Sequence, residues 1–242
     1  MSRAAPVTRN FVLVHGAWHG GWCYARVAAI LRAQGHRVFT PTLSGLGERS
    51  HLAGLGEIDL SVHIDDIVGV IRWERLDEVV LCGHSYGGLV AGGAADRVPE
   101  RIAALVYLDA IVPEDGKAML DYLEPEMAAA FVRMAAEHGG TLPPVAAAAL
   151  GVNAADEAMV DALCTPQPFA TYTERLSLSG AHLGIARKIH VRATAWPGAE
   201  RTARAHQRRA GEAGWAVAEV SGGHDLMLDA PDAVAQVLLA AL

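Results

Sequence analysis

The 242-residue chain has almost no lysine, few cysteines and no apolar run long enough to cross a membrane. A spanning helix needs about 20 consecutive apolar residues, so the sequence excludes an integral membrane protein. Lys117 and Lys188 are its two lysines, and the formal net charge is −7. Nucleic-acid binders usually present a basic face. The densest basic stretch, 201–209, has the arginine spacing of the solvated side of a helix, so we expect no nucleic-acid partner.

The few cysteines exclude further classes of protein. They are odd in number and widely spaced, so they suggest neither a disulfide framework nor a zinc site. We expect no metal and no organic cofactor. Charged residues make up only 19% of the chain against 52% hydrophobic ones, which excludes wholesale disorder. The chain reaches an apolar run by Phe11 without room for a signal peptide, so we expect a cytoplasmic location, and a homodimer stays open.

What the chain does have is a regular alternation of short apolar runs and helical patterns. Continuously apolar strands that are separated by helices are typical of a parallel sheet covered on both faces. Right-handed crossovers then give a doubly wound, mostly parallel α/β fold. The expected strands are 11–14, 37–40, 78–82, 102–108, 188–194 and 215–220. The expected helices are 22–34, 62–73, 86–97 and a last one that opens at Pro231.

Residues 113–185 interrupt this alternation. The 73 residues between the fourth and fifth strands contain alanine-rich, helix-prone stretches at 128–130 and 146–149, and no strand is evident. So long a connection is uncommon in a compact sheet protein unless it forms a lid or a functional loop. We therefore predict a single domain, with a core of residues 1–112 and 186–242 and a helical cap of residues 113–185 inserted between core strands.

The sequence Gly83-His84-Ser85-Tyr86-Gly87 fits the G-x-S-x-G pattern of a nucleophile elbow. A strand is expected before it and a helix after it, which is the context that this turn requires. The glycines two positions before and after the serine let strand and helix approach closely. We therefore predict that Ser85 is a catalytic nucleophile, exposed above the sheet. His84 is interpreted as structural, because its side chain should point away from the site.

A serine hydroxyl is a weak nucleophile without an adjacent base. The last predicted strand ends at Val220 and is followed by two glycines and His224. Active sites in doubly wound sheets lie beyond the carboxyl ends of the strands. The order of serine and then histidine along the chain is also the one found in α/β-hydrolases. We predict that His224 is the base.

The third member of such a site is a carboxylate that hydrogen-bonds the far nitrogen of the imidazole. Asp109 directly follows the apolar strand 102–108, where an ionised carboxylate is costly unless it is paired. We predict that Asp109 is the acid, although it could instead bond backbone amides of its loop. Glu200, the first acidic residue after the fifth strand, and Asp225, the neighbour of the predicted base, stay open as alternatives.

Two backbone amides are expected to bind the oxyanion of a tetrahedral intermediate. The residue after the nucleophile supplies one of them, the N–H of Tyr86. The loop after the first strand supplies the other, and we choose the N–H of Ala17. His15 and His19 lie in the same loop, but glycines break it, so no metal site is predicted.

Together these stretches resemble the α/β-hydrolase superfamily, and within it the small branch of plant methyl esterases, hydroxynitrile lyases and bacterial esterases. The matching stretches are 11–22, 83–88, 105–109 and 223–225. The resemblance implies Ser85 as nucleophile, His224 as base, and Ala17 and Tyr86 as oxyanion donors. The chain departs from the family where the acid usually lies, after the fifth strand. Some superfamily members, such as a subset of haloalkane dehalogenases, carry the acid after the preceding strand, where Asp109 lies.

The resemblance also implies a reaction class. Plant hydroxynitrile lyases of this branch typically carry a threonine where this chain has Gly16 and a lysine where it has Asp225, and an aspartate would oppose a departing cyanide. We therefore expect a serine esterase that cleaves small to medium, largely apolar carboxylic esters through an acyl-enzyme. A polyketide-processing thioesterase or cyclase acting on a thioester, a lyase-like enzyme and a catalytically silent ligand receptor stay open. Trp18, Phe169 and Tyr172 are predicted to line the substrate pocket.

Overall fold

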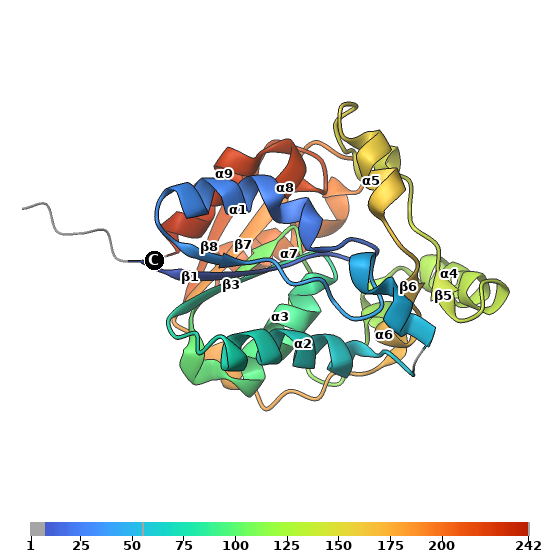
Figure 1. Ribbon diagram of the computed structural model, residues 1–242, viewed down its shortest axis with the longest axis horizontal. Coiled ribbons are helices and arrows are strands. Elements are labelled where there is room, and N and C mark those ends of the chain that lie inside the picture. The colour runs from blue at the N-terminus through green and yellow to red at the C-terminus, as the bar shows by residue number, and fades with distance from the viewer. Residues whose placement is uncertain (1–7, 55, 242) are drawn as a thin grey trace, which may run out of the picture.

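One six-stranded sheet organises the computed structural model of the chain (Figure 1), which describes residues 8–54 and 56–241 without the side chains of residues 201, 202 and 205. Its strands are β1 (Asn10–Val14), β2 (Arg37–Phe39), β3 (Val79–His84), β4 (Ile102–Leu108), β7 (Arg187–Ala193) and β8 (Trp215–Val220). Every pairing between them is parallel, and the strand order is β2-β1-β3-β4-β7-β8. The chain therefore builds one half of the sheet, reverses and builds the other, which is the doubly wound arrangement.

Helices cover both faces of the sheet, which is why its central strands are apolar on both sides. The core helices are α1 (Ala25–Ala33), α2 (Leu60–Trp73), α3 (Gly87–Arg97), α7 (Ala199–Ala210), α8 (Leu226–Asp229) and α9 (Pro231–Ala240). In Figure 1, α1, α8 and α9 lie above the sheet, and α2 and α3 lie below it. The buried side chains divide in the same way into two apolar clusters, one on each face. The fold is thus the expected three-layer α/β fold.

The predicted core elements are present, with shifts at their ends. β4 and β8 have the expected bounds, while β7 lies one residue earlier than predicted. α2 begins before residue 62 because the Asp59 side chain caps it, accepting a hydrogen bond from the Val62 N–H at 2.9 Å. Residues 47–54 form a 3-10 helix, and a 3-10 turn at 21–24 precedes α1.

The segment between β4 and β7 lies beyond the carboxyl ends of the strands, at the right of Figure 1. It contains α4 (Pro125–Glu137), α5 (Glu157–Leu163), α6 (Ala170–Thr173) and short 3-10 turns. The expectation that it holds no strand is wrong, because β5 (Thr141–Leu142) and β6 (Gln167–Pro168) form a short antiparallel pair. Strands of two residues carry no sequence pattern, since tertiary contacts decide them. The division at residues 113 and 185 stays a prediction, and the outer ends of the predicted core lie outside the described residues.

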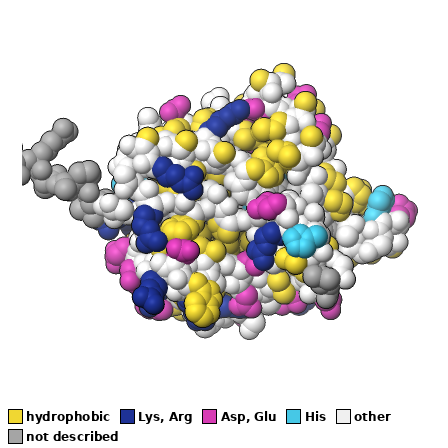
Figure 2. Space-filling model, in the orientation of Figure 1, with side chains coloured by type: hydrophobic (Ala, Val, Ile, Leu, Met, Phe, Trp, Pro, Cys, Tyr) yellow, Lys and Arg dark blue, Asp and Glu magenta, His cyan; other side chains and the backbone are white. Residues whose placement is uncertain are grey.

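The surface offers no simpler clue to function. On the face in Figure 2, Lys and Arg side chains are scattered among acidic and apolar ones. No helix in the described ranges is both long and apolar enough to span a bilayer. The carboxyl ends of the strands, where the predicted residues meet, are therefore the place to look for a site.

Candidate active site

Ser85 lies at the sharp turn between β3 and α3, with its backbone in the left-handed region (φ 54°). Residues with a side chain rarely adopt this region, and strained turns of this kind cluster at functional sites. The turn is anchored to the sheet because the Ser85 N–H donates to the Leu108 carbonyl oxygen at 3.3 Å. A Cβ atom on Gly83 would collide with the backbone of Gly87, so strand and helix do approach as closely as the motif requires.

The fold brings Asp109 and His224 into direct contact across 115 residues of sequence. The Nδ1–H of His224 donates to Asp109 Oδ2 at 2.7 Å. The other carboxylate oxygen accepts the Ala193 N–H at 3.1 Å, and the Asp109 side chain has no exposed surface. The carboxylate thus contacts both the histidine and the backbone, and Nε2 is the ring nitrogen of His224 that is left for proton transfer.

Ser85 and His224 line the same cavity, together with Asp109. The structure shows no hydrogen bond between the described side chains of Ser85 and His224. In ligand-free enzymes this contact is often long, and it tightens when substrate binds.

The two other carboxylates considered as the acid lie elsewhere. Glu200 is in the first turn of α7 and lines a separate cavity. Asp225 is completely buried, and its Oδ2 accepts a hydrogen bond from His19 Nε2 at 2.9 Å. Of the three carboxylates, Asp109 is the one that bonds the His224 ring.

Two rings enclose the imidazole of His224. The ring centroids of His84 and Trp196 are each 4.6 Å from that of His224. The Nε2–H of His84 also donates to the carbonyl oxygen of His224 at 2.9 Å. Burial and the neighbouring charge of His224 lower the pKa of His84 to about 3, so this ring is neutral. His84 is buried and does not line the cavity, as its interpretation as a structural residue predicts, and its ring packs against the ring of the base.

The two predicted oxyanion donors have free N–H groups. Within the described ranges, neither the Ala17 N–H nor the Tyr86 N–H donates a hydrogen bond to another protein group. The loop of Ala17 is nevertheless fixed, since its carbonyl accepts the Nδ1–H of His19 at 2.8 Å. Trp18 follows in the left-handed region (φ 67°) and donates its N–H to Gln167 Oε1 at 3.0 Å. Free amides on a fixed loop are what an oxyanion site requires.

The cavity beside Ser85 has a volume of about 550 Å³ and largely apolar walls. These walls include two of the three predicted pocket residues, Trp18 and Tyr172. The Tyr172 ring stacks on the ring of Tyr86, with centroids 5.8 Å apart and an angle of 7°. The prediction for Phe169 is not met, because this residue precedes α6 and lines a different cavity, of about 390 Å³. One turn of α6 separates the two side chains and directs them to different cavities.

The wall of the cavity beside Ser85 also contains polar residues. Among them are His190, Arg208 and Arg209. The expectation that the arginines of 201–209 lie on a solvated helix side is met by Arg204 and Arg208, which are exposed, while Arg209 is half-buried and the side chain of Arg201 lies outside the described residues. Arg209 pairs with Glu212 at 2.5 Å, whereas Arg208 has no ion pair in the described part of the chain.

The His190 side chain in the cavity wall is neutral. Burial and the nearby His206 lower the pKa of His190 to about 4. The two Nδ1 atoms lie 3.1 Å apart, so one of the rings donates this hydrogen bond and the other accepts it. His190 therefore contributes a neutral ring to the cavity wall.

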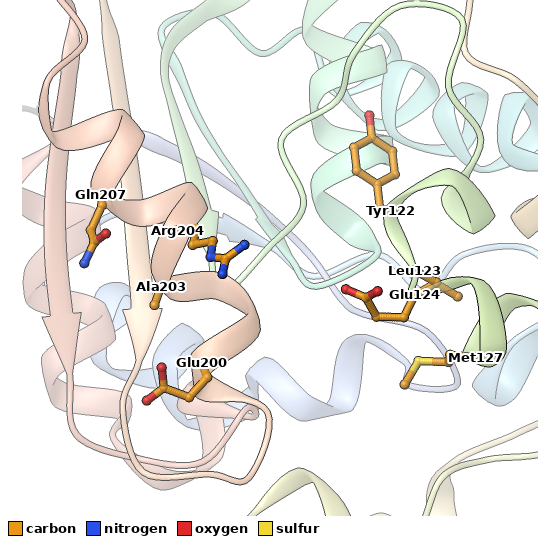
Figure 3. A pocket seen from close by; sticks show the side chains of 8 residues that line it. All are labelled: Tyr122, Leu123, Glu124, Met127, Glu200, Ala203, Arg204 and Gln207. Atoms are coloured by element: carbon orange, nitrogen blue, oxygen red, sulfur yellow. The ribbon is translucent and has the colours of Figure 1, made fainter.

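A second cavity, of about 530 Å³, shares the wall residues Tyr122, Leu123 and Met127 with the first. Figure 3 shows Arg204 entering it from α7 and Glu124 from the start of α4. Ser85, Asp109 and His224 do not line it. We interpret it as an outer extension of the catalytic cavity.

The histidines of the first loop are used in hydrogen bonds to protein groups. His15 donates from Nδ1 to the Gly16 carbonyl at 2.8 Å, and its Nε2 accepts the Leu43 N–H at 3.0 Å. In the ranges that the structure describes, no group of three or more His, Cys, Asp or Glu side chains is arranged to hold a metal ion.

Comparison with known proteins identifies the family. A sequence model of the alpha/beta hydrolase family matches residues 11–237. The chain belongs to the alpha/beta hydrolase family. It is 44% identical over 242 aligned residues to the carbendazim hydrolyzing esterase of Nocardioides sp. (strain SG-4G), covering 96% of this chain and 98% of that protein. It is 34% identical over 131 residues to methylesterase 2 of Arabidopsis thaliana, covering 50% of this chain and 46% of that protein.

Solved structures share the fold. An extracellular alpha/beta-hydrolase from a Paenibacillus species superposes with a TM-score of 0.83 at 24% identity, covering 96% of this chain and 98% of that one. Polyneuridine aldehyde esterase superposes with a TM-score of 0.73 at 19% identity, covering 97% and 99%. The predicted superfamily, branch and fold class are thus confirmed, and the relationship makes the chain a carboxylic ester hydrolase.

Sequence reasoning missed three residues around this hydrolase site: His19, Trp196 and Arg208. Trp196 lies in the loop after the fifth predicted strand. Because this loop lacks the aspartate that is usual in the family, its other residues could have been considered as neighbours of the base. His19 was considered only as a metal ligand. No sequence pattern distinguishes Arg208, which lines this cavity, from Arg204, which lines the outer one, because the packing of α7 decides which cavity each borders.

Proposed function

We propose that the chain is a serine esterase in which Ser85 is the nucleophile, His224 the general base and Asp109 the acid. The observation that carries this proposal is the 2.7 Å hydrogen bond from His224 Nδ1 to Asp109 Oδ2 at the wall of the cavity that Ser85 lines. A buried carboxylate bonded to Nδ1 holds the correct tautomer of the imidazole and stabilises the imidazolium that forms during catalysis. The left-handed backbone of Ser85 also supports this assignment.

In the acylation step, Ser85 Oγ attacks the carbonyl carbon of the ester and gives its proton to His224 Nε2. The carbonyl π electrons move onto the oxygen, and the N–H groups of Ala17 and Tyr86 stabilise the resulting oxyanion. As the tetrahedral intermediate collapses, the bond to the alcohol oxygen breaks and His224 donates its proton to that oxygen. Ser85 then carries the acyl group as an ester.

In the deacylation step, water takes the place of the alcohol. His224 Nε2 accepts a proton from the water as its oxygen attacks the acyl carbon. The second intermediate collapses, the bond to Ser85 Oγ breaks, and His224 returns the proton to the serine. Water is the only co-reactant that these steps require.

The cavity supports a substrate of small to medium size with a largely apolar body. Its apolar wall includes Trp18, Phe131 and Tyr172. Arg208 also lines the cavity and would favour a substrate with a hydrogen-bond acceptor in addition to the scissile ester. The relative at 44% identity is named for hydrolysing carbendazim, so we propose carbendazim as the first specific substrate to test.

We further propose that residues 113–185 act as a cap that shapes this cavity. The segment holds Trp18 of the oxyanion loop from several sides: Nε1–H donates to the Leu142 carbonyl at 3.0 Å, and the Trp18 carbonyl accepts the Thr165 N–H at 2.9 Å. It also contributes Phe131 and Tyr172 to the wall. The segment is thus placed to select the substrate.

The test is an assay of p-nitrophenyl acetate, p-nitrophenyl butyrate and carbendazim with the wild type and Ser85→Ala. We expect hydrolysis of at least one ester and a loss of about 10⁴-fold or more in kcat in the variant. Thioester substrates in the same assay would reveal the thioesterase alternative. Binding of these compounds without turnover that depends on Ser85 would favour a receptor and overturn the proposal.

A hydroxynitrile lyase on the same machinery fits less well. A Cβ atom at Gly16 would lie 2.8 Å from His84 Nδ1, so the threonine of the plant lyases would collide with His84. The expectation that Asp225 opposes a departing anion is wrong, however, because this side chain is buried against His19 and does not line the cavity.

A further inference from the structure

A second histidine–carboxylate pair lies behind the His224–Asp109 pair. The Nε2–H of His19 donates to Asp225 Oδ2 at 2.9 Å, and the two side chains are 2% and 0% exposed. The Nδ1–H of His19 donates to the carbonyl oxygen of Ala17 at 2.8 Å. A carbonyl and an ionised carboxylate can only accept hydrogen bonds, so both nitrogens of His19 carry a proton. The pair is therefore a buried ion pair.

The electrostatics agree with this protonation state. Burial alone would lower the pKa of His19, but the charge and hydrogen bond of Asp225 outweigh it and raise that pKa well above 6.5. Burial alone would raise the pKa of Asp225, but the charge and hydrogen bond of His19 hold it well below its usual range. A buried ion pair gains little stability over an apolar pair of the same size, because desolvation offsets the attraction. This favours a role beyond stability.

The ion pair joins the two loops that carry the proposed catalytic groups. His19 holds the carbonyl of Ala17, the residue whose N–H we assign to the oxyanion. Asp225 directly follows His224, and its Oδ1 lies 3.7 Å from His84 Nε2, the atom that donates to the His224 carbonyl. A shift of one loop would thus be transmitted to the other.

We propose that His19 and Asp225 are positioning residues that hold the Ala17 amide and the His224 imidazole at the mutual distance that the transition state requires. Neither side chain lines the substrate cavity, so the loss of the pair lowers kcat and leaves KM nearly unchanged. This inference rests on the proposed function, because it explains how the residues behind that site support it.

The groups that face the ion pair are few and can be named. Besides His84 and His224 they are His15, Cys23, Tyr24 and Cys164. Burial raises the pKa of Cys23 and that of Tyr24 well above their usual values, and it lowers that of His84, so these three groups are uncharged. Asp225 is therefore the second carboxylate near the His224 imidazolium, after Asp109.

The experiment compares three variants with the wild type on p-nitrophenyl butyrate. Asp225→Asn removes the carboxylate, and the double variant His19→Gln/Asp225→Asn replaces both charges with a neutral pair. Asp96→Asn is the matched control, since Asp96 accepts a hydrogen bond from His182 Nδ1 at 2.9 Å in another buried pair, remote from the cavity.

We expect both Asp225 variants to lose about tenfold to a hundredfold in kcat, as a misplaced catalytic group does. KM should stay within about threefold of the wild-type value. Asp96→Asn should keep the wild-type kcat and KM. If the single variant fails to fold because His19 is left unpaired, the double variant carries the test, since it buries no uncompensated charge.

A folded double variant with wild-type kcat would overturn the inference. So would a loss in kcat that Asp96→Asn reproduces. These outcomes differ from failure of the proposed function. If Ser85→Ala retains turnover, the proposed function is wrong. If Ser85→Ala is inactive while the Asp225 variants match the wild type, only the positioning role is wrong.

Discussion

Two regions of the molecule each hold a buried histidine–aspartate pair at the same distance. Behind the active site, His19 and Asp225 are 2.9 Å apart, and near the end of α3, His182 and Asp96 are also 2.9 Å apart. The side chains of the second pair are 5% and 7% exposed, so burial does not distinguish the two regions. The difference lies in their remaining partners.

In the α3 region, the second carboxylate oxygen of Asp96, Oδ2, accepts the Ser179 N–H at 2.6 Å. His182 Nε2 is buried without a hydrogen bond to a described residue. That pair fastens one surface loop to a helix. His19, in contrast, uses both ring nitrogens, one for Asp225 and one for the oxyanion loop. The comparison teaches that the partners of a buried pair, more than its geometry, indicate whether it serves stability or catalysis.

The largest expected effect concerns the His224–Asp109 pair in the cavity wall. Asp109→Asn should lower kcat by about 10⁴-fold, because an amide at this position leaves His224 in the wrong tautomer. Glu200→Gln, at the wall of the outer cavity, should stay within about twofold of the wild type. Steady-state kinetics on p-nitrophenyl butyrate measure both. The reverse pattern would show that Glu200 is the acid.

The next largest effect should distinguish the His19–Asp225 pair from the His182–Asp96 pair by the loss in free energy of unfolding. Asp225→Asn leaves a buried imidazolium without its counter-charge, which should cost about 3–5 kcal/mol. Asp96→Asn should cost about 1–3 kcal/mol, the range for a lost buried hydrogen bond. Urea denaturation of both variants gives the free energies of unfolding. Equal losses would contradict the ionised state assigned to His19.

Stability should also depend on pH, because several buried histidines are neutral. Burial lowers the pKa of His15 and of His84 to about 3, and that of His63 and of His190 to about 4. In the unfolded chain these groups bind protons below pH 6.5, the usual histidine value. The folded state binds them only near pH 3–4, so stability is full above 6.5 and falls as the pH drops below it.

The slope of this dependence is measurable. Each of these histidines contributes up to about 1.4 kcal/mol per pH unit below 6.5. His19 acts with the opposite sign: its raised folded pKa gives stability that is full below 6.5 and is lost as the pH rises above it. Urea denaturation at several pH values should show that the free energy of unfolding falls steeply on the acid side. His63→Gln should reduce the slope of this fall by the contribution of one histidine, up to about 1.4 kcal/mol per pH unit. A flat profile between about pH 5 and 6.5 would contradict the neutral states.

A smaller effect is expected at the ring that faces the base. Trp196→Leu removes the aromatic face 4.6 Å from the His224 ring centroid. A cation–π contact of about 0.5–2 kcal/mol corresponds to a fall of about threefold to thirtyfold in kcat. Trp73→Leu is the matched control, because Trp73 is 88% exposed and remote from the cavity. Equal kinetics in the two variants would assign Trp196 to the cavity wall alone.

The smallest effect should appear at Arg208, in the wall of the cavity. Arg208→Gln should lower kcat/KM by about threefold for a p-nitrophenyl monoester of a dicarboxylic acid, because an exposed ion pair contributes up to about 1 kcal/mol. An uncharged ester of the same chain length should be unaffected. Arg204→Gln, in the outer cavity, is the control. An equal response of both esters to Arg208→Gln would remove the arginine from substrate recognition.

The sequence predicts the parts of this fold that depend on local pattern. β4 and β8 have the expected bounds because continuous apolar runs between turn residues are a local signal. Ser85, Asp109 and His224 could be chosen because each follows a predicted strand, and carboxyl ends of parallel strands meet at one edge. Their catalytic roles stay predictions, although the structure brings Asp109 and His224 into contact.

The rest depends on contacts that have no local signature. The His19–Asp225 pair joins residues 206 positions apart, and neither residue is unusual in its own stretch. Phe169 and Tyr172 lie on one turn of helix, so only the packing of α6 decides which of them lines the cavity. For the same reason, the arginines of α7 could not be assigned to one cavity or the other.

The central claim, that Ser85 is the nucleophile activated by the His224–Asp109 pair, is tested most directly by titration with diethyl p-nitrophenyl phosphate. Attack by the serine releases p-nitrophenolate and leaves a phosphorylated side chain that does not turn over, and mass spectrometry locates the label. The account predicts about one equivalent of p-nitrophenolate per chain, a label on Ser85, and labelling slowed by orders of magnitude in Asp109→Asn. A label on another residue, or unchanged labelling of Ser85→Ala, would contradict it.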